Sequence, residues 1–197
     1  MSELVASEDV IVPHPIQLLV TDDLRRNRLT VFLRLLLAIP LILWIVLWSI
    51  LVAFAVVVAW VVGLVAGRVP EGLHDFMAAY TRFSTHLSAY LWLVADPYPG
   101  FTGEPGYPAD LRIAPATSQN RLTILFRVIL AIPAMIVVNV LQNVAWIVAF
   151  LGWFYALFTG RMSKGMRDLL AYCTRYQAQT YGYLLLLTQR YPSFSDE

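Results

Sequence analysis

The sequence has a single cysteine and few charged residues. Cys173 is the only cysteine among 197 residues, so the chain cannot form an intrachain disulfide or a cysteine-based metal site. Charged residues make up 14% of the chain, against about 25% in soluble domains, and hydrophobic residues make up 59%. The net charge of +1 is too small for nucleic-acid binding by overall charge. This composition excludes an ordinary soluble domain.

Sequence signatures of catalysis are missing as well. The chain contains no nucleophile elbow, Walker loop or dinucleotide fingerprint. His14, His74 and His86 lack the spacing of a metal-binding pair. We therefore expect no enzyme activity, no cofactor and no metal ion. Residues 2–12 mix acidic and apolar side chains, which predicts that no cleaved secretory signal is present.

Two long stretches, Leu35 to Ala66 and Val128 to Phe158, carry no charged residue. Each is ~31 residues long, well over the ~18 that mark a transmembrane candidate. They predict an integral membrane protein. Arginines flank both ends of each stretch, and by the positive-inside rule both ends then face the cytoplasm. The location we expect is a bacterial plasma membrane, with cytoplasmic termini.

The chain contains an internal repeat. Residues 14–101 match residues 107–194 at a constant offset of 93 without a gap, and 26 of the 88 pairs are identical. We divide the chain into an N-terminal tail (1–13), a first membrane repeat (14–106) and a second membrane repeat (107–197). Matching stretches include Asn27-Arg28-Leu29-Thr30 with Asn120-Arg121-Leu122-Thr123, and Gly67-Arg68 with Gly160-Arg161.

The end of the second apolar stretch carries a family resemblance. Leu157-Phe158-Thr159-Gly160-Arg161, an amphipathic segment and then Tyr191-Pro192 near Phe194 resemble the domain-of-unknown-function family 4389. The resemblance covers nearly the whole chain in two copies, and the first copy departs from it with Val65-Ala66 before Gly67. It implies a membrane protein and adds no activity, cofactor or site residue.

Each repeat is expected to contain the same elements. Short extended segments should form strands outside the bilayer, able to pair with each other. A helix should start at an asparagine N-cap and bend at a proline, and an amphipathic helix at the membrane interface should follow. The segments are His14–Thr21 and Tyr107–Pro115, the caps Asn27 and Asn120, the prolines Pro40 and Pro133, and the amphipathic helices Leu73–Val94 and Met166–Leu187.

The length of the apolar stretches favours helical hairpins. A helix of ~31 residues rises ~46 Å, whereas the hydrocarbon core is ~30 Å thick. Asn139, Gln142 and Asn143, in the middle of the second stretch, suit a turn. The predicted fold is an all-α integral membrane protein of two tandem pseudo-symmetric repeats, each a transmembrane or re-entrant helical hairpin plus an amphipathic interfacial helix. The alternative is a single tilted helix whose three polar residues face another helix.

Arginines and aspartates provide the candidate site residues. Four arginines at the helix starts are predicted to contact anionic lipid head groups, or alternatively to snorkel without a specific lipid. Two Asp-Arg pairs, seven residues apart on one helix face, are predicted to form a polar site, or alternatively to be solvated at the interface. The arginines are Arg28, Arg34, Arg121 and Arg127, and the pairs are Asp75 with Arg82 and Asp168 with Arg175.

These features favour a non-enzymatic function. We expect an accessory subunit or scaffold that binds membrane lipids, anionic ones among them, and a membrane-protein partner or further copies of itself, with no nucleic acid bound. The alternative is a small transporter or channel for an ion or small solute, in which Asn139, Gln142, Asn143 and the Asp-Arg pairs line a path.

Overall fold

The computed structural model describes residues 13–195. Nearly all of the predicted N-terminal tail lies outside the described residues. So do residues 2–12, which were predicted not to contain a cleaved secretory signal. The described elements follow in the order β1 (Ile16–Val20), α1 (Arg28–Ala66), α2 (Glu71–Leu91), β2 (Ala109–Ile113), α3 (Arg121–Leu125), α4 (Arg127–Thr159) and α5 (Lys164–Leu184).

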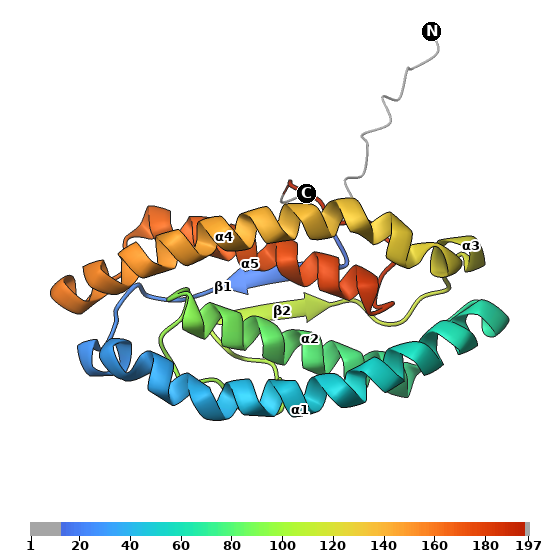
Figure 1. Ribbon diagram of the computed structural model, residues 1–197, viewed down its shortest axis with the longest axis horizontal. Helices are drawn as coiled ribbons and strands as arrows, with labels where there is room; N and C mark the ends of the chain where they lie inside the picture. Colours follow the sequence, from blue (N-terminus) through green and yellow to red (C-terminus); the bar gives the residue numbers. More distant parts are fainter. Residues whose placement is uncertain (1–12, 196–197) are drawn as a thin grey trace, which may run out of the picture.

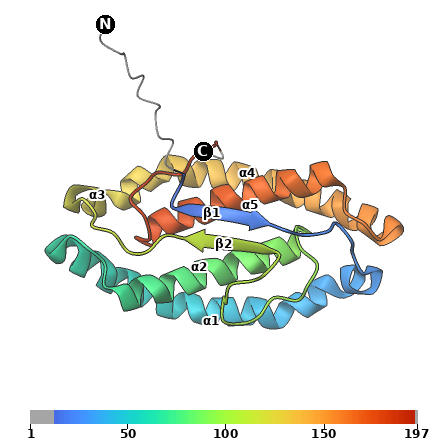
Figure 2. The same ribbon diagram turned by 180° about the vertical axis from the view of Figure 1, so that it is seen from behind.

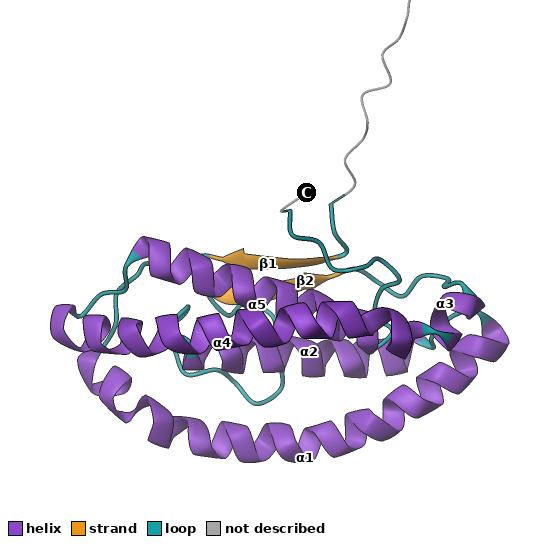
Figure 3. Ribbon diagram, turned by 45° about the horizontal axis from the view of Figure 1, so that its top comes forward, coloured by secondary structure: helices purple, strands orange, loops and turns teal. Residues whose placement is uncertain are grey.

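The elements form layers. Helices α2 and α5 lie side by side in the middle, with α1 along one side and α4 along the other (Figure 1). The strands β1 and β2 cover α5 and α2 on one face, which is turned toward the reader in Figure 2. Helix α1 lies on the opposite face and bows away from the strands (Figure 3). The molecule therefore has a strand face and a long-helix face.

A pseudo-twofold axis relates the two repeats. Strands β1 and β2 pair antiparallel, and Leu18 lies opposite Leu111, its own counterpart at the offset of 93. An antiparallel pair of this register has its twofold axis normal to the sheet. The predicted tandem repeats are confirmed, and so is the predicted pairing of the extended segments. Equivalent helices consequently run in opposite directions, α1 against α4 and α2 against α5.

The long helices are continuous, so the predicted hairpins are wrong. Helix α1 has 39 residues and α4 has 33, and the break that separates α3 from α4 lies at Phe126, near the start. The apolar stretches contain no glycine pair or other turn signal at their centres. Asn143 is helical, and its side-chain amide donates a 2.8 Å hydrogen bond to the Asn139 carbonyl one turn earlier. Polar residues at that point do not make a turn.

The predicted caps are confirmed. The side chain of Asn27 accepts a hydrogen bond from the Leu29 amide (3.0 Å), and that of Asn120 accepts one from the Leu122 amide (2.9 Å). At the other end, α1 stops at Gly67 (φ 72°) and α4 at Gly160 (φ 71°). Both φ values lie in the left-handed region that favours glycine, which fixes where each helix ends.

Each long helix is joined to the start of the other. The indole N–H of Trp60 donates to the Ile124 carbonyl (3.0 Å), and that of its counterpart Trp153 donates to the Val31 carbonyl (2.8 Å). At the first junction, Gly63 brings the α1 backbone close to the Ile124 side chain. The ends of α1 and α4 are thus linked, while α2 and α5 pack between their middles.

Helices α2 and α5 form the core of the molecule. They pack against each other, against the long helices and beneath the strands. The buried face of α2 includes the polar side chains Thr81, Thr85 and His86 as well as Phe83 and Tyr90. A location of these helices at a membrane interface stays a prediction.

Candidate functional site

Apolar side chains cover the outside of both long helices. Only 11% of the most apolar window of α1 is buried, and only 22% of that of α4. The residues of α1 that face the protein form one stripe, which passes through Val31, Ala38, Leu41 and Ala59. Large exposed side chains such as Leu47 (58%) occupy the other faces. Helices α1 and α4 are each long and apolar enough to cross a membrane.

Two of the four arginines predicted to contact lipid are buried. Arg34 and Arg127 are each 2% exposed. Arg34 donates to the carbonyls of Tyr90 and Ala95 and forms a 2.6 Å ion pair with Asp96. Its guanidinium also stacks on the Tyr90 ring, 4.4 Å from the centroid. This arginine therefore holds the turn that follows α2, and the head-group prediction no longer applies to it.

Arg127 holds the corresponding turn, after α5, in the second repeat. It donates to the carbonyls of Tyr183 and Thr188 and lies 4.5 Å from the centroid of the Tyr183 ring. Its third partner is the side-chain oxygen of Gln119, at 2.7 Å, where Arg34 has a carboxylate. The head-group prediction is corrected for Arg127 too, because its donors bind carbonyls at the end of α5 and in the turn that follows.

The other two arginines remain exposed. The guanidinium of Arg28 lies beside Gly160 at the end of α4, and that of Arg121 lies beside Gly67 at the end of α1. A cation at a helix start opposes the helix dipole, whereas one at a helix end is favourable, by ~0.3–1 kcal/mol in each case. Each arginine thus offsets the cost at its own helix with a gain at the other. Head-group contacts remain predictions for Arg28 and Arg121.

The predicted Asp-Arg pairs are not brought together. Asp75 is exposed and its carboxylate lies 3.5 Å from His74, while Arg82 lies 3.5 Å from Asp110. Asp168 pairs with the neighbouring Arg167 at 2.8 Å, and Arg175 donates to the Phe194 carbonyl and stacks on Tyr172. The two members of each pair lie two turns apart on one helix face, and each of them contacts a nearer partner instead.

A polar cluster that the sequence did not predict lies beneath β2. His86 Nε2 lies 2.9 Å from Asp110 Oδ1, and Arg82 donates to the Leu111 carbonyl at 3.2 Å. The ring of Tyr107 lies 4.7 Å from that of His86. Burial lowers the pKa of His86, although Asp110 acts in the opposite direction. Burial also raises the pKa of Tyr107. The strand pairing brings Asp110 over α2, and no spacing in the sequence signals this.

The cluster has no chemical counterpart in the second repeat. Gln179 replaces His86 and donates to the Ile16 carbonyl at 3.1 Å, and Gln17 replaces Asp110. A structural polar contact between helix and strand is retained, while the pair of His86 with Asp110 is not. Within residues 13–195, no group of three or more His, Cys, Asp or Glu side chains is placed to hold a metal ion.

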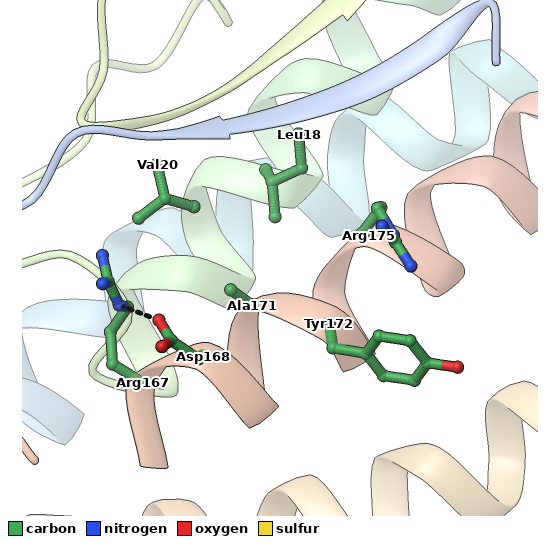
Figure 4. Close-up of a pocket in the computed structure, with 7 residues that line it drawn as sticks. All are labelled: Leu18, Val20, Arg167, Asp168, Ala171, Tyr172 and Arg175. Carbon is green, nitrogen blue, oxygen red and sulfur yellow. Dashed lines mark ion pairs between the residues drawn. The ribbon is translucent and has the colours of Figure 1, made fainter. Parts of the chain in front are cut away.

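A pocket of about 330 Å³ lies between β1 and α5 (Figure 4). Leu18 and Val20 approach it from the strand, and Arg167, Asp168 and Arg175 approach it from the helix. Figure 4 shows Arg167 directed to Asp168 and away from Arg175. The two arginines therefore do not converge on one point, and the pocket presents no defined anion site.

An apolar groove of about 240 Å³ opens between the start of α1 and the second half of α4. Leu35, Trp146, Phe150 and Trp153 are among its lining residues, with Arg34 at its base. The polar residues of the transporter hypothesis lie elsewhere, since Asn139 and Asn143 are exposed on α4. The groove has the chemistry of a site for a hydrocarbon chain.

Comparison with known proteins identifies a family of domains. The family model described as "Domain of unknown function (DUF4389)" matches residues 28–102 and, a second time, residues 121–196. Each match begins at the first residue of α1 or α3, so the family unit covers the helices of each repeat and leaves out its strand. No curated protein and no solved structure matches the chain.

Proposed function

The chain belongs to the DUF4389 family, and because that family carries no assigned activity we propose a function from the geometry: a non-enzymatic integral membrane protein that acts as a scaffold or accessory subunit. It binds lipid through α1 and α4 and is available to a membrane-protein partner. The observation that carries the proposal is the exposed apolar surface of these two helices along their whole length.

The size of this surface supports the proposal. Monomeric soluble proteins rarely expose contiguous apolar patches beyond a few hundred Å². The narrow buried stripes of α1 and α4 leave most of two helices, of 39 and 33 residues, without protein contact. Burial of apolar surface contributes about 25 cal/mol per Å², so a covering of lipid is strongly favoured over water.

The interior arrangement supports a structural role. The buried charged groups are engaged by the protein's own carbonyls and carboxylates, as Arg34 and Arg127 illustrate. The groove between α1 and α4 is lined by aromatic and aliphatic side chains, which suits an acyl chain. The polar residues available to a transport path lie on separate surfaces, and we therefore retain the scaffold as the proposal.

Extraction of the native membrane tests whether the protein is embedded in the membrane. The protein should stay with the membrane through an alkaline carbonate wash and leave it only with detergent. Native mass spectrometry of the gently extracted protein should then show bound phospholipid or a stoichiometric protein partner. Release by carbonate would overturn membrane embedding, and a bare chain or bare homo-oligomer would overturn the scaffold role.

A further inference from the structure

We propose that α1 and α4 lie parallel to the membrane within a single leaflet, with the strand face in the aqueous phase, and do not cross the bilayer. The inference rests on the proposed membrane embedding and adds the surface and the side of attachment. The partner is the hydrocarbon of one leaflet, which covers the long-helix face.

The pseudo-twofold axis fixes what crossing would require. The linked ends of the long helices are symmetric about the axis, because Trp60 contacts Ile124 as Trp153 contacts Val31. The middle of α1, at Trp48, packs on Phe83 in the middle of α2. Arg82, next to it, donates to the carbonyl of Leu111 at the centre of the strand pair. The middle of the long helices, the middle of α2 and the centre of the strand pair therefore lie at the same level along the direction of the long helices.

Crossing would place that shared level at the centre of the bilayer. Each strand has one partner strand in the described part of the chain, so the outward N–H and C=O groups of both strands would face hydrocarbon. Open sheet edges do not occur there, because each unsatisfied group costs several kcal/mol. The exposed Arg112 and the pair Arg82–Asp110 would lie at the same depth.

The length of the helices argues in the same direction. An apolar stretch of ~46 Å fits a ~30 Å core only at a tilt of about 50°, beyond the usual range of about 0–40° for spanning helices. Lying flat, a helix about 10 Å across is immersed in one leaflet, whose hydrocarbon is about 15 Å deep. The flat orientation therefore covers α1 on all its apolar sides.

The charges are distributed as a flat orientation requires. Arg25 pairs with Arg161 in a backbone bridge at one end of the long helices, and Arg68 pairs with Ser118 at the other. Arginines at both ends can reach head groups of the same leaflet. Ser195 shares a surface pocket with β1, so the described chain ends on the strand face as well. The strands, the chain end and the arginines then meet water on one side.

Single cysteines in a Cys173→Ser parent test the orientation. The positions are Arg25 before α1, Glu71 after it, Arg112 on the strand face and Leu47 in the middle of α1, all exposed. Sealed membrane vesicles of known orientation are treated with a membrane-impermeant maleimide from either side. The unmutated chain, whose Cys173 is buried, should stay unlabelled, and the Cys173→Ser parent gives the background of the labelling reaction.

We expect Arg25→Cys, Glu71→Cys and Arg112→Cys to be labelled from one and the same side, and Leu47→Cys from neither. Labelling of positions 25 and 71 from opposite sides, with 112 protected, would overturn the flat orientation and leave membrane embedding intact. If the protein is instead recovered without a membrane, and position 47 is labelled together with the other three, the proposed function itself is overturned.

Discussion

At the scale of single residues, Arg34 and Arg127 show how the same sequence feature serves opposite purposes. An arginine at the edge of an apolar stretch has the same sequence signature whether it reaches a head group or closes a turn. The repeated tyrosines Tyr90 and Tyr183, which stack on the two guanidiniums, were the signal available in the sequence. The backbone carbonyls that these arginines serve leave no trace in the sequence, so the buried role could not be predicted.

Replacing either arginine should destabilise the fold. Arg127→Met removes the side-chain donor to the carbonyls of Tyr183 and Thr188, and we expect a loss of about 2–4 kcal/mol in the free energy of unfolding in detergent. Arg34→Met should cost more, because it also leaves the Asp96 carboxylate without its cation. Denaturant titration followed by circular dichroism measures both. Arg161→Met, at an exposed position, is the control, and an equal effect of all three would contradict this role.

The polar cluster at His86 predicts a dependence of stability on pH. Burial holds the pKa of His86 below 6.5, so the unfolded chain binds more protons than the folded chain between the folded-state pKa and 6.5. The free energy of unfolding should therefore be highest above pH 6.5 and fall as the pH decreases through that window. His86→Gln, which copies Gln179 of the second repeat, should flatten the curve. His14, whose pKa burial also lowers, supplies the remaining slope.

Arg28 and Arg121 carry the head-group prediction that the structure leaves open. Each contact with an anionic head group is worth about 1 kcal/mol, so Arg28→Gln or Arg121→Gln should weaken binding of anionic phospholipid about fivefold. Native mass spectrometry or lipid titration in neutral detergent measures the affinity. Arg112→Gln on the strand face is the matched control. A uniform change in all three variants would show that only net charge matters.

At the scale of elements, most boundaries could be predicted and their packing could not. The asparagine caps placed the starts of α1 and α3 correctly, because this signal is local. The break at Phe126, which separates α3 from α4, had no such signal. The hairpin prediction failed because it assumed that an apolar helix must match the bilayer thickness. The periodic apolar face predicted for α2 stays a prediction, because the same pattern fits lipid, a neighbouring helix or a strand.

The junctions between the long helices depend on two tryptophans. Trp153→Phe removes the donor to the Val31 carbonyl while keeping most of the apolar volume, and we expect a loss of about 0.5–1.5 kcal/mol. Trp60→Phe should have the same effect at the other junction by symmetry. Hydrogen exchange should report faster opening at the ends of α1 and α4. Trp146→Phe, an exposed tryptophan of α4, should change neither measurement.

At the scale of the whole molecule, the repeat was visible in the sequence and its symmetry axis was not. An offset of 93 shows that two units share a fold, but it does not show how the two units contact each other. The pairing of Leu18 with Leu111 reveals the axis, because a twofold axis passes between a residue and its own counterpart. Each repeat alone leaves its strand unpaired and its middle helix half uncovered.

This symmetry predicts that the second repeat by itself forms a homodimer. In a symmetric pair of two 107–197 fragments, Leu111 faces Leu111 and each Asp110 faces the Arg112 of the other fragment across the strands, which adds two opposite-charge pairs of about 0.2–1 kcal/mol each. Analytical ultracentrifugation in detergent should give a dimer. The fragment in this dimer should keep the helix content of the repeat. Arg112→Asp, which places like charges opposite each other, should weaken the fragment dimer and leave the full chain folded, because Arg112 there faces Gln17. A fragment that is fully helical as a monomer would contradict the dependence of each repeat on its counterpart.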